Sequence, residues 1–168
     1  MASAGNGSLD HLLGEMFKSA AGVNLVHVPY KGAAQANTDL VAGQVSVTFT
    51  SWPSVRSFVQ TGKLRLLAVA SEEPSPLLPN VPMIAETVPG VSAVSWYGLL
   101  APAGTPKDII EKLRAEMPKV LSEKTLKDAL EGQGAEVVYK TPDEFAGLIK
   151  NDLEKWAVIV EQSGARVD

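Results

Sequence analysis

Apolar residues recur at helical spacing over several parts of the chain. After Ser8 they follow every three to four residues as far as Gly22, which predicts a helix with Ser8 as its N-cap and Gly22 as its C-cap. The same spacing and similar start and stop signals predict further helices over residues 33–41, 53–62, 83–87, 107–121, 124–130 and 142–163.

Other segments carry alternating or continuous apolar runs of strand length. They predict strands over residues 24–29, 45–49, 64–70, 93–101 and 135–139. Because strands alternate with helices, we expect an α/β fold with parallel pairing and right-handed crossovers. The segment 71–89 contains five prolines and is the best candidate boundary between an N-terminal and a C-terminal half.

Composition and charge remove several classes of function. The 168 residues suffice for one ordinary domain or two small lobes, and the net charge of -4 argues against binding to nucleic acid or an anionic membrane. The absence of cysteine excludes disulfides and thiolate metal sites. No apolar run is long enough to span a bilayer, and the first residues lack the features of a signal peptide. We therefore expect either a cytoplasmic protein or part of a longer chain.

Small and polar residues mark three turns, each just before a predicted helix. A helix N-terminus offers unpaired N–H groups and a positive dipole end, and glycine lets a ligand approach the backbone, so such turns suit a carboxylate or phosphate. The second and third turns follow predicted strands, at the edge where α/β sheets bind ligands. The candidate ligand-binding residues are Asn6, Gly7, Ser8, Tyr30, Gly32, Ala33, Thr50 and Ser51.

Two other interpretations of these turns stay open: plain helix caps and a hydrolase. Glycine and serine before a helix also serve as plain caps, and neither a Walker lysine nor a G-x-G-x-x-G pattern supports a nucleotide site, so no cofactor is expected. A hydrolase with Ser8 as nucleophile and His11 as base is conceivable, but no third residue orients the pair. His27 falls in a predicted strand, where a structural hydrogen bond is the simplest role. We expect a protein that is not an enzyme.

Several stretches resemble one family in order and spacing. They are "GNGSLDHLLGEMFKSAAGVNLVHVPYKGAAQANTDLVAGQV", "GKLRLLAVAS", "LPNVPMIAETVPG", "WYGLLAPAGTP" and the C-terminal "TPDEFAGLIKNDLEKWAVIVEQSGARVD". Together they are similar to the Bug proteins, the TctC-like extracytoplasmic solute receptors of tripartite tricarboxylate transporters. The resemblance covers essentially the whole chain.

The resemblance implies a type II periplasmic-binding-protein fold, with one complete lobe and the C-terminal part of the other. Residues 1–95 would form the ligand-binding lobe, and 96–168 the hinge strand and the remnant of the first lobe. It further implies a periplasmic receptor that binds small carboxylates without chemistry and delivers them to membrane permease subunits. The positions matching the family's carboxylate loops are Gly7, Ser8, Tyr30, Gly32 and Ala33.

The chain departs from the family pattern in two ways. The family carries a signal peptide and most of its first lobe before the first turn, so the resemblance implies a truncated form. Thr50-Ser51-Trp52 stands where members often have an Asp-Asn-like pair, which weakens the case for an amine-bearing ligand. A half receptor should expose apolar surface, so we expect a homodimer or a domain-swapped oligomer. The alternative hypothesis is a binding-deficient remnant that acts as a self-associating module.

Overall fold

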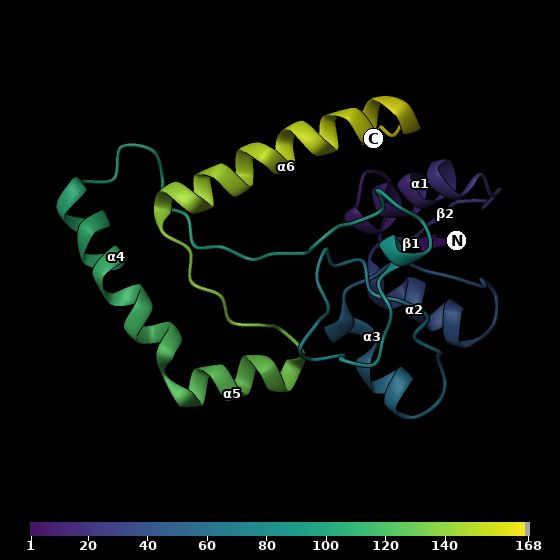
Figure 1. Ribbon diagram of the computed structural model, residues 1–168, viewed down its shortest axis with the longest axis horizontal. Coiled ribbons are helices and arrows are strands. Elements are labelled where there is room, and N and C mark those ends of the chain that lie inside the picture. The colour runs from purple at the N-terminus through teal and green to yellow at the C-terminus, as the bar shows by residue number, and fades with distance from the viewer. Residues whose placement is uncertain (167–168) are drawn as a thin grey trace. The chain divides into compact units, whose positions relative to one another are not determined.

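The computed structural model describes residues 1–166 and divides into two compact units (Figure 1). The first comprises Met1–Ser95 and the end of the chain from Lys155, and the second comprises Trp96–Glu154. The boundary after Ser95 falls where the predicted 1–95 lobe ends, but the residues from Lys155 group with the first unit. The assignment of either unit to a lobe of the family stays a prediction.

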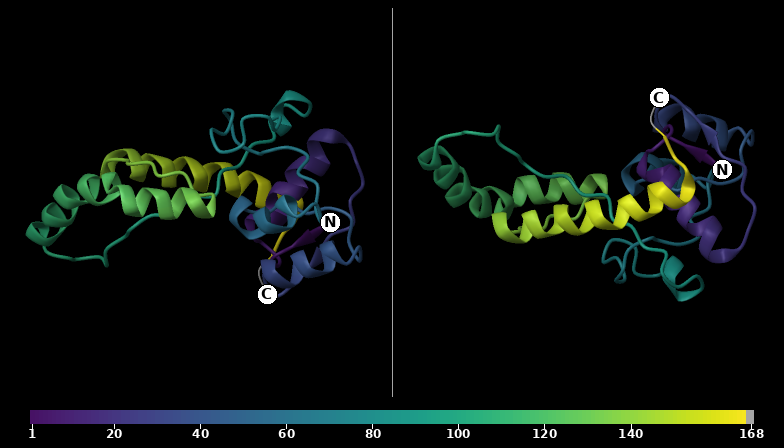
Figure 2. Two further views of the ribbon diagram at one scale, coloured as in Figure 1. Left: turned by 90° about the horizontal axis from the view of Figure 1, so that it is seen from below. Right: turned by 90° about the horizontal axis from the view of Figure 1, so that it is seen from above.

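The first unit is organised by a short parallel sheet near the N-terminus (Figures 1 and 2). Strand β1 (Ala2–Ser3) pairs with β2 (Val28–Pro29), and Ala2 also forms a parallel bridge with Thr48. The parallel pairing is confirmed, but β1 was not among the predicted strands. Two residues are too few to show a hydrophobic period, so the sequence offers no signal for β1.

Helices of the first unit begin and end close to the predicted positions. They are α1 (Leu9–Ala21), α2 (Ala33–Val41), α3 (Trp52–Gln60) and the 3-10 turn η1 (Ile84–Glu86). The Ser8 hydroxyl accepts the N–H of His11, and Gly22 adopts a left-handed φ of 63°, so both predicted caps of α1 are confirmed.

Two small apolar clusters form the core of this unit. In one, the buried residues are Leu13, Met16, Ile84 and Val91, and Trp156 and Ile159 pack against them. In the other, the buried residues are Ala2, Ala36 and Val45, with Val28, Tyr30 and Leu40 against them. The second cluster lies between the sheet and α2, and it fixes the start of α2 relative to both strands.

The second unit contains α4 (Lys107–Ser122), α5 (Lys124–Gln133) and the first part of α6 (Pro142–Ser163). The indole N–H of Trp96 donates to Asp152 at 2.7 Å, and its ring meets Phe145 edge to face. No described residue of this unit is fully buried. The unit is therefore held by local helical bonds and a few aromatic contacts rather than by a core.

Most of the strand predictions are wrong, because the predicted segments do not form strands in the structure. Only Val28–Pro29 of 24–29 is in a sheet, and Thr48 and Val69 each make a single bridge. Residues 93–101 and 135–139 form no strand or bridge, although the Ala93 N–H donates to the Ala70 carbonyl at 2.7 Å. A strand exists only where a neighbouring segment supplies its ladder of hydrogen bonds, and within residues 1–166 those neighbours are mostly missing. The fold is thus mostly helical with a small parallel sheet.

Candidate functional site

The three predicted turns follow three adjacent parallel segments. The first comes after β1, the second after β2 and the third after Thr48, and the register aligns Ser3 with Pro29. The Ser3 carbonyl accepts the N–H of Tyr30 at 3.1 Å, and a Cβ on Gly5 would lie only 3.3 Å from the Tyr30 carbonyl oxygen. The carboxyl ends of parallel segments share one edge, so the structure brings all three turns to it.

The first turn, Gly5–Ser8, is closed by its own hydrogen bonds. The N–H and the hydroxyl of Ser8 both donate to the Gly5 carbonyl, at 3.2 and 2.8 Å. The N–H of Gly7 donates to Nδ1 of His11 at 3.2 Å. Asn6 lies exposed between them. The expected donors Gly7 and Ser8 therefore already have partners inside the chain.

An acidic side chain also occupies the start of α1. The Asp10 carboxylate accepts the N–H of Ala4 and its own N–H. Burial raises the pKa of Asp10, and these two hydrogen bonds act in the opposite direction. A negative group already satisfies part of this helix terminus, which makes it a weaker anion site than the sequence predicts.

The second turn leaves the terminus of α2 open. Gly32 is the N-cap, with φ of 124° and no side-chain cap, and no other atom lies within 4 Å of the place that a Cβ would take. Among residues 1–166 the N–H groups of Ala33 and Ala34 have no acceptor. The Tyr30 hydroxyl donates to Asp39 at 2.9 Å, a bond that raises the pKa of Tyr30. Unpaired amides at a helix N-terminus can accept an anion.

The third turn adds hydroxyl groups. Ser54 donates to the Ser51 carbonyl at 2.8 Å, and the Thr50 hydroxyl lies 3.1 Å from the Ser54 hydroxyl. Ser51 is the N-cap of α3, and its own hydroxyl has no partner within the described part of the chain. The buried Asn37 links α2 to α3 by donating to the Ser54 carbonyl at 3.3 Å. The starts of α2 and α3 are therefore tied together.

Sequence reasoning missed the arrangement of the two histidines. The rings of His11 and His27 stack with centroids 3.8 Å apart, and Ser3 Oγ lies 2.6 Å from Nε2 of His27. The predicted structural hydrogen bond of His27 is thus present. Burial lowers the pKa of both histidines. Only the pairing of β1 with β2 brings them together, and the sequence contains no sign of β1.

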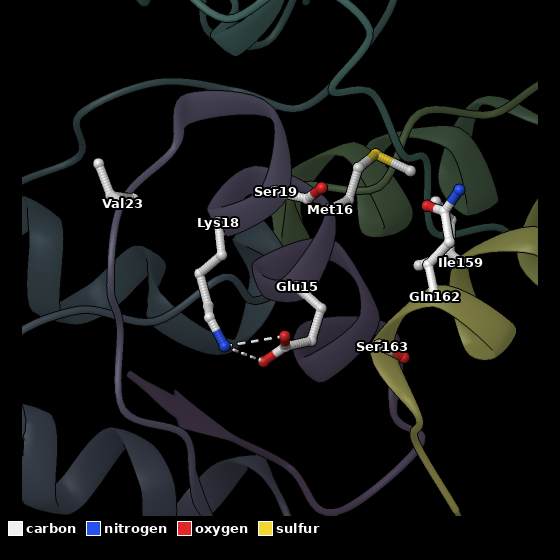
Figure 3. A pocket seen from close by; sticks show the side chains of 8 residues that line it. All are labelled: Glu15, Met16, Lys18, Ser19, Val23, Ile159, Gln162 and Ser163. Carbon is white, nitrogen blue, oxygen red and sulfur yellow. Dashed lines mark hydrogen bonds and ion pairs between the residues drawn. The ribbon is translucent and has the colours of Figure 1, made fainter.

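A separate hollow is lined mainly by residues of α1 and of the end of α6 (Figure 3). Its volume is about 240 Å³, and its lining includes Glu15, Lys18, Ile159 and Gln162. Both carboxylate oxygens of Glu15 lie 2.8 Å from Lys18 Nζ, so the lysine charge is already balanced. None of the predicted site residues line this hollow.

The hydrolase hypothesis finds no support in the geometry. The Ser8 hydroxyl donates to the Gly5 carbonyl, and Nδ1 of His11 is bonded to the Gly7 N–H, so no hydrogen bond joins the two side chains.

Within residues 1–166 no group of three or more His, Asp or Glu side chains could hold a metal ion. In the same range no helix has both the length and the apolar composition of a membrane span.

Comparison with known proteins gives a consistent family. The sequence profile of the tripartite tricarboxylate transporter family receptor, TctC, matches residues 1–165. A UPF0065 protein in the tcbD-tcbE intergenic region of Pseudomonas sp. strain P51 is 37% identical over 95% of this chain and 48% of its own length. BugT of Bordetella pertussis is 36% identical over 96% of this chain and 50% of its own. The chain thus spans about half the length of these relatives.

The solved structures agree. Rpa4515 of R. palustris, determined with adipate, matches 98% of this chain and 55% of its own with a TM-score of 0.87 and 32% identity. The fold is therefore part of a periplasmic-binding-protein-like fold. Other solved relatives are described as a periplasmic transporter and as the periplasmic binding protein BugD, and MatC from Rhodopseudomonas palustris was determined with bound malate.

Proposed function

The chain belongs to the TctC family of tripartite tricarboxylate transporter receptors, and we propose that it binds a small dicarboxylate at the edge of its short sheet. The observation that carries the proposal is the meeting of three turns at the carboxyl ends of three parallel segments. Relatives that bind adipate and malate support the choice of ligand class. The family is one of receptors and not of enzymes.

The second and third turns would make the main contacts. The open N–H groups of Ala33 and Ala34 and the free Ser51 hydroxyl offer hydrogen-bond donors to one carboxylate. Gly32 leaves open space for the ligand to approach the backbone. Tyr30 and Thr50 would border the same carboxylate.

The first turn would supply an additional, weaker contact to the ligand. Asn6 is exposed there, but Gly7 and Ser8 must exchange an internal hydrogen bond for one to the ligand. We expect this turn to contribute less affinity than the start of α2. By family membership the protein would act in the periplasm and deliver its ligand to membrane permease subunits.

A thermal-shift screen against adipate, malate and other small mono-, di- and tricarboxylates tests the proposal. Ligand at about 100 times its dissociation constant adds about 2.7 kcal/mol to the free energy of unfolding, which raises Tm by a few degrees. If none of these acids moves a sharp, cooperative melt, the proposal is wrong.

A matched pair of glycines sharpens the test. Gly32→Val should abolish the shift because it fills the approach to the α2 amides, whereas Gly43→Val at the far end of α2 should keep it. Both glycines have positive φ and open space around the place that a Cβ would take, but Gly32, with φ of 124° and ψ of 161°, lies in a backbone region that is essentially restricted to glycine, so circular dichroism must first show that Gly32→Val keeps its fold. Equal loss of binding in both would point to misfolding rather than to a site.

A second candidate function is self-association, and the exposed second unit favours it. Residues 96–154 bury no side chain fully, and their large exposed apolar residues are Tyr97, Leu99, Leu100, Ile109, Leu113, Val120, Val138, Tyr139 and Leu153. The occupant we propose is a second copy of this chain, pairing along the unpaired extended segment 96–101. Light scattering that finds only monomer at micromolar concentration would overturn it. Gly32→Val should leave this association intact.

A further inference from the structure

The stacked histidines are connected to the backbone of the first turn. His11 is only 7% exposed and Ser3 is fully buried, so the hydrogen bonds that these two side chains make with the first turn are shielded from solvent. The ring planes of His11 and His27 differ by 7°, and the Ser3 hydroxyl joins His27 to the turn by also accepting the N–H of Gly5 at 3.2 Å. The pair therefore supports the turn from two sides.

The hydrogen bond from Gly7 fixes the protonation state of His11. An imidazole nitrogen accepts a hydrogen bond only when it carries no proton, so His11 is neutral with its proton on Nε2. Protonation at Nδ1 would replace this acceptor with a donor and release the N–H of Gly7. The carboxylate of Asp10, the neighbouring acid on α1, accepts the N–H of Ala4 and the N–H of Asp10 itself.

The charges around the pair act in both directions. Glu15 lies 3.8 Å from Nε2 of His11 and favours the charged ring. Lys18 disfavours a charge on either ring, and the Met1 ammonium disfavours one on His27. Two imidazolium rings with centroids 3.8 Å apart would repel each other, so the pair takes up one proton well before a second.

We propose that His11 is a proton-linked positioning residue, so that carboxylate capture at the first turn is coupled to uptake of one proton by the stacked pair. The inference rests on the proposed function and adds a regulation to the same site. In the neutral state His11 keeps the N–H of Gly7 away from a ligand. In the protonated state the Gly7 N–H is free, and a positive ring stands beside it.

Calorimetric titration with malate and with adipate between about pH 8 and about pH 6 tests the coupling, because carboxylic acids of this kind are largely ionised in that range. The affinity should rise as pH falls, by up to tenfold per pH unit. Titrations in two buffers of different ionisation enthalpy should show uptake of up to one proton per ligand bound.

Two variants separate the roles of the rings. His11→Asn places an amide oxygen where Nδ1 stood, so it keeps an acceptor for Gly7 but cannot titrate, and the affinity should become independent of pH. His27→Gln keeps a polar atom near Ser3 and removes the stacked partner. Its pH dependence should persist and move to higher pH, because His11 then titrates without a neighbouring ring.

The outcomes distinguish this inference from the proposed function. Binding that stays equally strong across the pH range overturns the coupling and leaves the receptor function standing. Absence of binding at every pH overturns both. One further measurement needs no ligand: the NMR signal of the Gly7 amide should shift as the His11 ring titrates. A Gly7 signal that does not move during that titration overturns the inference by itself.

Discussion

His11 and His27 also make the stability of the fold depend on pH. Burial lowers the pKa of both in the folded state, so the unfolded chain binds protons more readily below its ordinary value of about 6.5. The free energy of unfolding should be highest above that pH and fall as the pH drops toward the lowered folded values. Urea unfolding at a series of pH values measures this. His11→Asn should flatten the fall, and an unchanged slope would contradict the prediction.

Asp10 should act in the opposite direction at lower pH. Its pKa is raised in the folded state, so the folded chain gains a proton before the unfolded chain does. As the pH falls through that raised value toward about 4, this carboxyl adds stability rather than removing it. The histidine effect begins as the pH falls below about 6.5, the aspartate effect ends near pH 4, and the two have opposite signs.

Gly5 is the residue whose backbone most closely constrains the first turn. Its φ is 134°, and an added Cβ would lie 3.3 Å from the Tyr30 carbonyl oxygen. Gly5→Ala should lower the free energy of unfolding by about 2 kcal/mol, because it adds both backbone strain and a close contact. Gly22→Ala, with φ of 63° and open space, should cost about 1 kcal/mol. Equal losses in urea unfolding would contradict the prediction, because Gly5→Ala would then cost no more than placing a Cβ at an ordinary left-handed φ.

At the scale of secondary-structure elements, the N-caps of α1 and α6 can be compared directly, because a side-chain hydroxyl forms each. Ser8 caps α1, and Thr141 caps α6 in a reciprocal box with Glu144, whose pKa is lowered by the hydrogen bond from the Thr141 N–H. Ser8→Ala and Thr141→Ala should each lower stability by about 1 kcal/mol. Only Ser8→Ala should also weaken carboxylate binding, because only that turn borders the proposed site. Calorimetric titration of both variants decides, and equal affinities would remove Ser8 from the site.

The helices could be predicted from the sequence because their signals are local. The apolar spacing of α1, its Ser8 cap and its Gly22 end all lie within a single short stretch of chain. A strand is different: residues 93–101 have the composition of a strand, yet their state depends on a neighbour that the sequence pattern does not name. Helix bounds were therefore close and strand bounds were not.

The placement of the turns at the candidate site was predictable to a similar degree, whereas their role in binding stays a prediction. The rule that ligands sit at the carboxyl ends of strands places the turns after residues 28 and 48 on one edge, as the structure has them. The sequence could not reveal that Gly7 and Ser8 form their hydrogen bonds within the turn, or that His11 meets His27. The meeting of the two histidines depends on β1, whose two residues carry no periodic signal, whereas the hydrogen bonds of Gly7 and Ser8 are made within the turn itself and the start of α1.

At the scale of the whole molecule, the two units should differ in local stability. Helix α1 buries His11, Leu12, Leu13, Gly14 and Met16, whereas α4 and α5 bury no residue. Backbone hydrogen bonds without buried neighbours open at low free energy, so the amides of α4 and α5 should exchange with deuterium much faster than those of α1. Hydrogen-exchange mass spectrometry of the intact chain measures both sets in one sample.

The concentration dependence of that exchange ties the prediction to self-association. If a second copy pairs along segment 96–101 and also covers the exposed apolar residues of α4, Ile109, Leu113 and Val120, exchange in α4 should slow as the protein is concentrated, because association stabilises only the covered elements. Exchange in α1, whose protection comes from its own core cluster, should stay constant and serves as the internal control. Protection of α4 as strong as that of α1 in dilute monomer would show that the second unit is stable by itself, and it would remove the physical reason for a partner.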